Sequence, residues 1–343
     1  MSNTIIIKER FKDFDKKIHV DGDKSLSIRW VLFASIANTK SVAQNLLLSE
    51  DVMAAINAIR KLGIKVTINK KTCVVYGKGI DGYQYKKNLT INAKNSGTLG
   101  RLILGLLINT PYPIKLIGDK SLSKRDFKRI SDPLTKFGAT FKLNKNKNLP
   151  LKIYGSKKLN PIFYEENIGS AQCKSAIILG GLRVDGLTII KAKKSRNHTE
   201  LLLQHLRQPI QSISKNNHDI IKVNKIKKIK AINYKIPSDI SSSAFFIVLT
   251  ALSKNSKLMI KNVNTNPSRI GIITILKKMG VKIVLKNQKI YKGEENADVY
   301  IESSKKLKSI NCPVELNSGA IDEFLIIFLV AAKANGVSYF RDL

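Results

Sequence analysis

The chain has 343 residues, of which 43% are hydrophobic and 25% are charged, an ordinary composition for a folded protein. This length favours two domains over one, and the longest apolar stretches are too short to cross a bilayer. The 60 lysines and arginines against 25 acidic residues give a net charge of +35, but this excess is dispersed along the chain. Because no RNP-like aromatic motif or arginine-rich tail accompanies the charge, nucleic-acid binding is the weaker interpretation of it.

The N-terminus and the cysteines bear on the cellular compartment. Residues 1–14 place a short apolar patch, three isoleucines at 5–7, directly before charged residues, which is unlike a secretory signal. Cys73, Cys173 and Cys312 are odd in number and widely scattered, so they form neither a disulfide framework nor a metal knuckle. We expect a cytoplasmic protein without a bound metal.

An internal repeat of a little over seventy residues organises the chain. Apolar helical segments are predicted to begin at Ser25, Ser96, Ser170, Ser241 and Ala320. The four serines are plausible N-caps, because a hydroxyl there accepts a hydrogen bond from an otherwise unpaired amide. Strand-like runs follow at 41–48, 112–118, 187–193, 257–263 and 337–343.

Amphipathic helices alternate with the apolar ones. They are predicted within the segments 54–66, 130–141 and 271–283. In each segment the helix ends at a glycine suited to a left-handed C-terminal position (Gly63, Gly138 and Gly280), and a strand follows. A degenerate copy at 199–210 has Gln208 in place of the glycine, and the alternation of Lys and Ile at 225–230 indicates an exposed strand. We expect the apolar helices to be buried, with a lobe boundary near Tyr234–Pro237.

The first two repeats carry cations and glycines at their helix starts. In 21–29 (DGDKSLSIR), Lys24, Ser25 and Arg29 surround a helix N-terminus, where free amides favour an anion. An ordinary capped helix with solvated cations explains that segment about equally well. In 95–101 (NSGTLGR), Asn95 and Gly97 repeat the design; Gly97 permits close approach of the backbone to a ligand.

Further candidates follow in the second and third repeats. Arg125 ends the segment GDKSLSKR, and its guanidinium suits a carboxylate or a phosphate. Ser170, Gln172 and Lys174 open the third apolar helix, and Ser195 and Arg196 are candidates for holding a phosphate. A hydrolase triad with His198 is excluded for want of a G-x-S-x-G elbow, so His198 is predicted to be structural.

The fifth helix start differs from the others, because Asp322 and Glu323 stand where the first three carry hydroxyls, amides and cations. Acids at a helix N-terminus stabilise the helix dipole, which is the simpler interpretation. In a site rich in lysine and arginine, however, one carboxylate would be the obvious group to accept a proton from a hydroxyl.

Eight ordered motifs together resemble the 5-enolpyruvylshikimate-3-phosphate (EPSP) synthase family over essentially the whole chain. They are DGDKSLSIR, NSGTLGR, GDKSLSKR, SAQCKSA, SRNHTE, SDISSSAFF, NVNTNPSRIG and AIDE. The resemblance implies an α/β protein, a two-lobed inside-out α/β barrel of repeated β-α-β-α-β-β units with the last unit missing. The first lobe would comprise residues 21–235, and the second residues 1–20 and 236–343.

The resemblance also implies a reaction: transfer of the enolpyruvyl group from phosphoenolpyruvate to the 5-hydroxyl of shikimate 3-phosphate, without cofactor, by a monomer. Lys24 would contact both substrates and help in proton transfer, and Asp322 would engage the shikimate hydroxyls as the base. The other implied ligands of shikimate 3-phosphate are Ser25, Arg29, Ser170, Gln172, Ser195 and Arg196. Those of phosphoenolpyruvate, besides Lys24, are Asn95, Gly97, Arg125 and Gln172.

Three alternatives stay open. Family members continue past the RDL of this chain into segments with further Glu, Arg and Lys ligands, so the chain could be an inactive fragment. UDP-N-acetylglucosamine enolpyruvyl transferase is similar in fold, but its reactive cysteine has no counterpart in GDKSLSKR. A basic nucleic-acid-binding protein on a related scaffold is the third.

Overall fold

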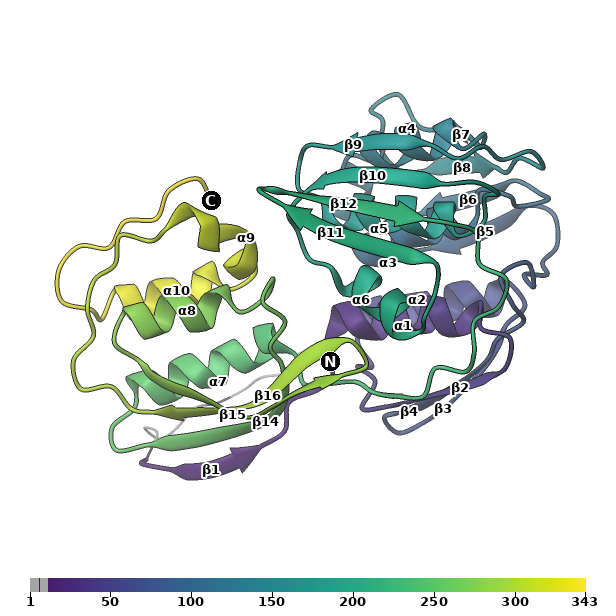
Figure 1. Ribbon diagram of the computed structural model, residues 1–343. Helices are drawn as coiled ribbons and strands as arrows, with labels where there is room; N and C mark the ends of the chain where they lie inside the picture. Colours follow the sequence, from purple (N-terminus) through teal and green to yellow (C-terminus); the bar gives the residue numbers. More distant parts are fainter. Residues whose placement is uncertain (1–5, 7–11) are drawn as a thin grey trace. The chain divides into compact units, whose positions relative to one another are not determined.

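The computed structural model describes residue 6 and residues 12–343, so most of the N-terminal apolar patch lies outside the described residues. The chain divides into two compact units (Figure 1). The larger unit consists of Asp21–Pro237 together with Tyr291–Glu294. The smaller unit consists of the described residues up to Val20, Ser238–Ile290 and Glu295–Leu343. In the part that the structure describes, no helix is long and apolar enough to cross a membrane.

One sheet of the larger unit shows the repeated topology plainly. Its elements in chain order are β5 (Leu89–Asn92), α3 (Gly97–Leu106), β6 (Ile114–Ile117), η1 (Leu122–Lys124), α4 (Lys128–Lys136), β7 (Thr140–Lys142) and β8 (Leu151–Tyr154). The strand order is β5-β6-β8-β7, with β5 and β6 parallel and both neighbours of β8 antiparallel to it. The parallel pair arises because α3 carries the chain back across the sheet.

The next sheet repeats this topology element for element. Its members are β9 (Phe163–Glu166), α5 (Ala171–Gly181), β10 (Thr188–Lys193), α6 (His198–His205), β11 (Ile210–Lys215) and β12 (His218–Val223). Again the first two strands are parallel and the hairpin is antiparallel, in the order β9-β10-β12-β11. The β-α-β-α-β-β unit predicted from the sequence is therefore present.

Two further sheets have the same order but borrow their parallel edge strand from elsewhere in the chain. The elements around the first are α1 (Lys24–Ser35), β2 (Lys40–Gln44), α2 (Glu50–Lys61), β3 (Lys65–Asn69), β4 (Thr72–Tyr76) and β13 (Tyr234–Lys235). Those around the second are β1 (Asp15–Ile18), α7 (Ile240–Leu252), β14 (Lys257–Asn264), α8 (Gly271–Lys278), β15 (Lys282–Tyr291) and β16 (Glu294–Glu302). Here β13 pairs in parallel with β2, and β1 pairs in parallel with β14.

The core of the larger unit is built from α1, α3 and α5, which Figure 1 shows with the sheets around them. From Leu26 to Ser35 every residue of α1 is buried, and α3 and α5 are buried almost throughout. α3 packs closely on α5 because Gly105 has no side chain: a Cβ there would collide with the carbonyl oxygen of Ala176. The prediction of buried apolar helices is confirmed in this unit.

The amphipathic helices lie as predicted, with one correction at a helix end. Gly63, Gly138 and Gly280 follow α2, α4 and α8 with φ of +85°, +117° and +91°, the left-handed region that glycine adopts without strain. After α6 the left-handed residue is Arg207, with φ of +52°, and not Gln208. The helix ends one residue earlier than the repeat spacing suggested.

Two predicted N-caps are confirmed and two are wrong. Ser96 and Ser170 accept hydrogen bonds from the amides of Leu99 and Cys173. In α1 and α7 the caps are aspartates: Asp23 accepts from the amide of Leu26, and Asp239 from that of Ser242. Ser25 and Ser241 lie inside their helices, because each aspartate two residues earlier in sequence begins the helix sooner.

The apolar helices of the smaller unit are only partly buried, contrary to prediction. The remaining elements here are η2 (Val314–Leu316), α9 (Asn317–Ala320) and α10 (Phe324–Ala331). α7 exposes Phe245 and Phe246, and Leu325 of α10 is 83% exposed. In its described residues this unit has one four-stranded sheet to cover these helices, whereas three such sheets enclose α1, α3 and α5.

Two predicted strands are absent from the described structure. Residues 225–230 form no strand: Ile226 and Ile229 are buried while the lysines between them are exposed, so the alternation reflects burial along an irregular segment. Residues 337–343 contribute a single isolated bridge, Asn311 to Tyr339, instead of a strand.

Candidate active site

The residues predicted for the site divide between the two units. Asp322 lies in the smaller unit, at the turn before α10, and its side chain is exposed. The others lie in the larger unit, at the starts of α1, α3 and α5 and in the loops that end at Arg125 and at α6. The larger unit therefore contains all the predicted anion ligands and can be described by itself.

The starts of α3 and α5 meet around Gly97. Arg101 donates a hydrogen bond to Oε1 of Gln172, whose Nε2 donates to Thr98 Oγ1 at 3.1 Å. A Cβ on Gly97 would lie 3.0 Å from Arg101 Nη1 and 3.1 Å from Arg125 Nη1. Gly97 thus lets two guanidiniums approach a helix N-terminus more closely than a side chain there would allow.

The surroundings of Gly97 are strongly cationic. Burial, together with the nearby Arg129 and Arg125, lowers the pKa of Arg101 to about 10, while Asp126 acts in the opposite direction. Nε of Arg101 and Nε of Arg129 are buried without a hydrogen-bond partner among the described residues. Arg125, which is exposed, donates from Nη2 to Asn95 Oδ1 at 3.2 Å. Clustered guanidiniums with unused donors are the arrangement that a bound anion stabilises.

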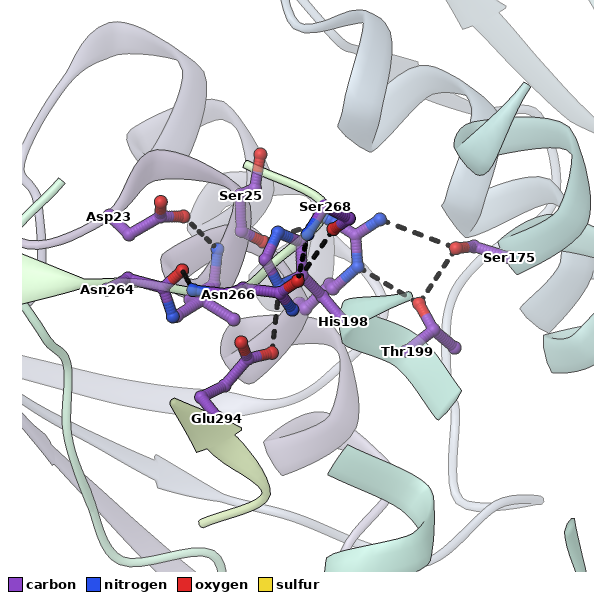
Figure 2. Close-up of polar contacts among 11 residues, drawn as sticks. Asp23, Ser25, Ser175, His198, Thr199, Asn264, Asn266, Ser268 and Glu294 are labelled. Atoms are coloured by element: carbon purple, nitrogen blue, oxygen red, sulfur yellow. Dashed lines mark hydrogen bonds and ion pairs between the residues drawn. The ribbon is translucent and has the colours of Figure 1, made fainter. Parts of the chain in front are cut away.

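Arg29, one of the buried residues of α1, belongs to a buried network of hydrogen bonds. Its Nε donates to Thr199 Oγ1 at 3.0 Å and its Nη2 to Ser175 Oγ at 3.4 Å, and these two hydroxyls are 2.8 Å apart (Figure 2). Burial lowers the pKa of Arg29 to about 10, although Glu200 acts in the opposite direction. Arg29 is 3% exposed, so it ties α1 to α5 and α6 as well as being a candidate ligand.

Lys24 and Ser25 stand on the first turn of α1. Nζ of Lys24 is 3.5 Å from Asp51 Oδ2, and about half of its side chain is exposed. An exposed ion pair of this kind contributes little to stability, so Lys24 can change partners at low cost. Ser25 is not needed as the cap, because Asp23 fills that position.

The start of α5 is held by a buried carboxylate. Glu166 accepts hydrogen bonds from the amides of Ile168, Gly169 and Ser170, at 2.9 to 3.2 Å. The Ser170 hydroxyl in turn accepts from the amide of Cys173. A hydroxyl that accepts one hydrogen bond still has a proton to donate, so Ser170 can serve both as cap and as anion ligand.

The loop between β10 and α6 carries Ser195 and Arg196. Oγ of Ser195 is shielded from solvent and has no hydrogen-bond partner in the described part of the chain. His198, which follows in the first turn of α6, is fully buried, and its Nδ1 lies 2.8 Å from Glu294 Oε1 (Figure 2). This buried pair agrees with the prediction that His198 is structural.

In the smaller unit, Glu323 is the buried acid at the helix start. It accepts a hydrogen bond from Ser241, which also accepts one from Arg269 Nη2 at 2.7 Å. The motifs SDISSSAFF and NVNTNPSRIG therefore meet AIDE within this unit. Among the described residues, no cluster of three His, Cys, Asp or Glu side chains could hold a metal ion.

Sequence reasoning missed several of these residues. Arg129 was not chosen as a site residue, and neither were Glu166, Thr199 or Glu294, while Lys174 was noted at the start of its helix but given no role. Arg101 had a visible signal, because it stands four residues after Gly97 on the same helix face. Glu294 had none, because it lies 96 residues from His198 in sequence and meets it only through the fold.

Comparison with known proteins decides the family. Residues 8–343 match the family model described as EPSP synthase (3-phosphoshikimate 1-carboxyvinyltransferase). The chain belongs to the EPSP synthase family. This confirms the resemblance seen in the sequence motifs.

Curated relatives and solved structures of EPSP synthases agree. The 3-phosphoshikimate 1-carboxyvinyltransferase of Ruthia magnifica subsp. Calyptogena magnifica is 40% identical over 95% of this chain and 73% of its own length. That of Hydrogenovibrio crunogenus is 39% identical over 98% and 76%, respectively. The structure of EPSP synthase from Acinetobacter baumannii superposes with a TM-score of 0.86 at 34% identity, covering 95% of this chain and 73% of that chain. The predicted two-lobed α/β fold of the family is confirmed.

Proposed function

We propose that this chain is a 3-phosphoshikimate 1-carboxyvinyltransferase of aromatic amino-acid biosynthesis. It transfers the enolpyruvyl group of phosphoenolpyruvate to the 5-hydroxyl of shikimate 3-phosphate and releases inorganic phosphate. Membership of the EPSP synthase family supports the reaction. The observation that carries it is the pair of guanidiniums, from Arg101 and Arg125, at the helix N-terminus beside Gly97.

The cationic surroundings of Gly97 suit phosphoenolpyruvate, which is a small, multiply charged anion. The helix amides and two guanidiniums would neutralise its phosphate and carboxylate. Asn95 holds Arg125 by a hydrogen bond, and Gln172 holds Arg101. We assign Lys24, Asn95, Gly97, Arg125 and Gln172 to this substrate.

The start of α5 and the loop before α6 suit the phosphate of shikimate 3-phosphate. Ser170 has a proton to donate, and the unpaired hydroxyl of Ser195 gains a partner if a ligand oxygen reaches it. Arg196 supplies charge in the same loop. We assign Lys24, Ser25, Arg29, Ser170, Gln172, Ser195, Arg196 and Asp322 to shikimate 3-phosphate.

The proposed reaction requires proton transfers to and from the substrates. The 5-hydroxyl adds to C2 of phosphoenolpyruvate and loses its proton, while the methylene carbon gains one; the resulting ketal then returns that methyl proton and expels phosphate. We propose Lys24 as a proton carrier, because the family resemblance places it against both substrates and about half of its side chain is exposed. Asp322 is proposed as the base on the family resemblance alone.

Calorimetric titration of the 343-residue chain tests this function against its alternatives. We expect saturable heat with shikimate 3-phosphate, none with UDP-N-acetylglucosamine, and tighter binding of phosphoenolpyruvate once shikimate 3-phosphate is bound. Heat with the nucleotide sugar and none with shikimate 3-phosphate would identify the sister activity. Preferential binding of single-stranded DNA that falls steeply with salt would identify a nucleic-acid-binding protein instead.

A further inference from the structure

Lys174 is a buried cation that the proposed reaction does not use. It lies in the first turn of α5 with a side chain that is 0% exposed. Its Nζ is 2.7 Å from Glu200 Oε1 on α6 and 3.7 Å from Asp219 Oδ2 on β12. Glu200 is itself almost fully buried. An ammonium and a carboxylate thus face each other out of contact with water, with Asp219 also near the ammonium and Arg29 also within the field of the carboxylate.

The same ammonium reaches the backbone of the candidate phosphate loop. Nζ of Lys174 lies 3.5 Å from the carbonyl oxygen of Ser195, a long hydrogen bond. Ser195 begins the segment that leads through Arg196 into α6. Glu200, the partner of Lys174, belongs to the first turn of that same helix. Lys174 therefore contacts the loop at Ser195 and pairs with Glu200 in the first turn of α6, the helix into which the loop leads.

Stability alone is a poor reason to keep this ion pair. Removing two charges from water is unfavourable, and a fold with well-packed apolar residues of similar volume in their place is often as stable or more stable. A buried pair does, however, fix geometry, because few other arrangements satisfy both charges. In the loop between β10 and α6, the amide of Lys194 donates a hydrogen bond to the carbonyl oxygen of Asn217 at 3.1 Å.

We propose that Lys174 is a positioning residue for the phosphate of shikimate 3-phosphate. Its ammonium, compensated by Glu200, fixes the Ser195 carbonyl and so sets the direction of the Ser195 and Arg196 side chains. It acts through these residues and does not touch the substrate. The proposal rests on the proposed function, since it concerns how the same site grips the phosphate.

The test compares shikimate 3-phosphate with shikimate, which lacks only the phosphate. The dissociation constant of shikimate divided by that of shikimate 3-phosphate measures the contribution of the phosphate alone. We expect Lys174→Met to lower this ratio by about tenfold, the value of one well-placed charge-assisted hydrogen bond, while shikimate affinity changes less than about twofold. A general loss of structure would instead weaken both ligands together.

A second variant guards against misfolding. Lys174→Met leaves the Glu200 carboxylate buried without its nearest cation, whereas Lys174→Met with Glu200→Gln removes both charges of the pair. We expect the double variant to regain most of the wild-type melting temperature and to keep the lowered ratio. A folded double variant with the wild-type ratio would overturn the proposal.

Matched controls come from neighbouring residues. Lys191→Met makes the same change on β10, where Lys191 pairs with Glu165 and is 41% exposed, and we expect the wild-type ratio. A ratio lowered as much by Lys191→Met as by Lys174→Met would overturn the proposal, because general charge would explain both. If the wild-type protein itself does not distinguish the two ligands, the proposed function fails and the positioning role fails with it.

Discussion

Arg101 on α3 donates a hydrogen bond to Gln172 on α5, joining two helix starts that are 71 residues apart in sequence. Each start belongs to one copy of the same β-α-β-α-β-β repeat. The repeat therefore brings equivalent helix starts together, and Gly97 lets the guanidiniums of Arg101 and Arg125 approach one of them closely. Several measurable consequences follow from this relationship.

Gly97→Ala should weaken phosphoenolpyruvate binding without destabilising the protein. The new Cβ would lie 3.0 and 3.1 Å from two guanidinium nitrogens, which are flexible ends that can move aside. Alanine also has a higher helix propensity than glycine. We expect an unchanged or higher melting temperature, near wild-type affinity for shikimate 3-phosphate, and about tenfold weaker phosphoenolpyruvate binding. An equal loss of affinity for both ligands would contradict a site at Gly97 that is specific for phosphoenolpyruvate.

Asp23 and Ser25 should separate helix capping from ligand binding. Asp23→Ala removes the acceptor for the amide of Leu26 and should lower the free energy of unfolding by about 1 kcal/mol or more. Ser25→Ala should leave that free energy unchanged and weaken shikimate 3-phosphate. Urea unfolding and titration of both variants check this. A larger stability loss at Ser25 than at Asp23 would be inconsistent with the cap seen here.

Lys24→Met should abolish tight binding of shikimate 3-phosphate while leaving the melting temperature nearly unchanged. Its ion pair with Asp51 is half exposed, and such pairs contribute little to folding. Lys225→Met is a matched control, since Lys225 is also about half exposed and pairs with Asp185. Comparable loss of binding in the control would point to net charge instead of a specific contact.

The buried thiols predict how stability depends on pH. Burial raises the pKa of Cys173 from 9.0 to about 12, with Glu166 adding to the effect, so the folded protein holds this proton more tightly than the unfolded chain. The associated stability is fully present below pH 9 and is lost as pH rises toward 12. Cys73, raised to about 11, acts in the same direction, whereas Arg101, lowered to about 10, acts oppositely above pH 10.

Unfolding in urea under reducing conditions at pH 8.5 and pH 10 measures this effect. Because unfolded cysteine titrates near pH 9, wild type should lose about 1 kcal/mol through Cys173 over this interval. Cys173→Ala should lose correspondingly less. If wild type and variant show the same pH dependence, the thiol keeps an ordinary pKa in the fold.

Local patterns predicted the helices well, because capping and periodicity act over a few residues. Ser96 and Ser170 cap where expected, and the glycines after α2, α4 and α8 are left-handed. Asp23 was overlooked because two capping residues stand close together and only the backbone decides between them. Periodicity misled at 225–230, where alternating burial occurs without a sheet partner.

The supporting contacts of the site could not be predicted from one sequence. Lys174 looked like one of many lysines; its pairing with Glu200 depends on how α5 packs beside α6. Likewise, Arg29 was chosen for its charge, but its burial against Thr199 and Ser175 appears only once three helix starts are assembled. Long-range pairing of buried charges leaves no period or motif to read.

Titration of the wild-type chain with shikimate 3-phosphate and with shikimate, under identical conditions, tests most directly whether the larger unit is a phosphate-recognising site. Charge-assisted hydrogen bonds from the start of α5 and the following loop should make the phosphorylated ligand bind at least about tenfold tighter. Equal affinities for the two ligands would contradict the assignment of Ser170, Ser195 and Arg196 to the phosphate.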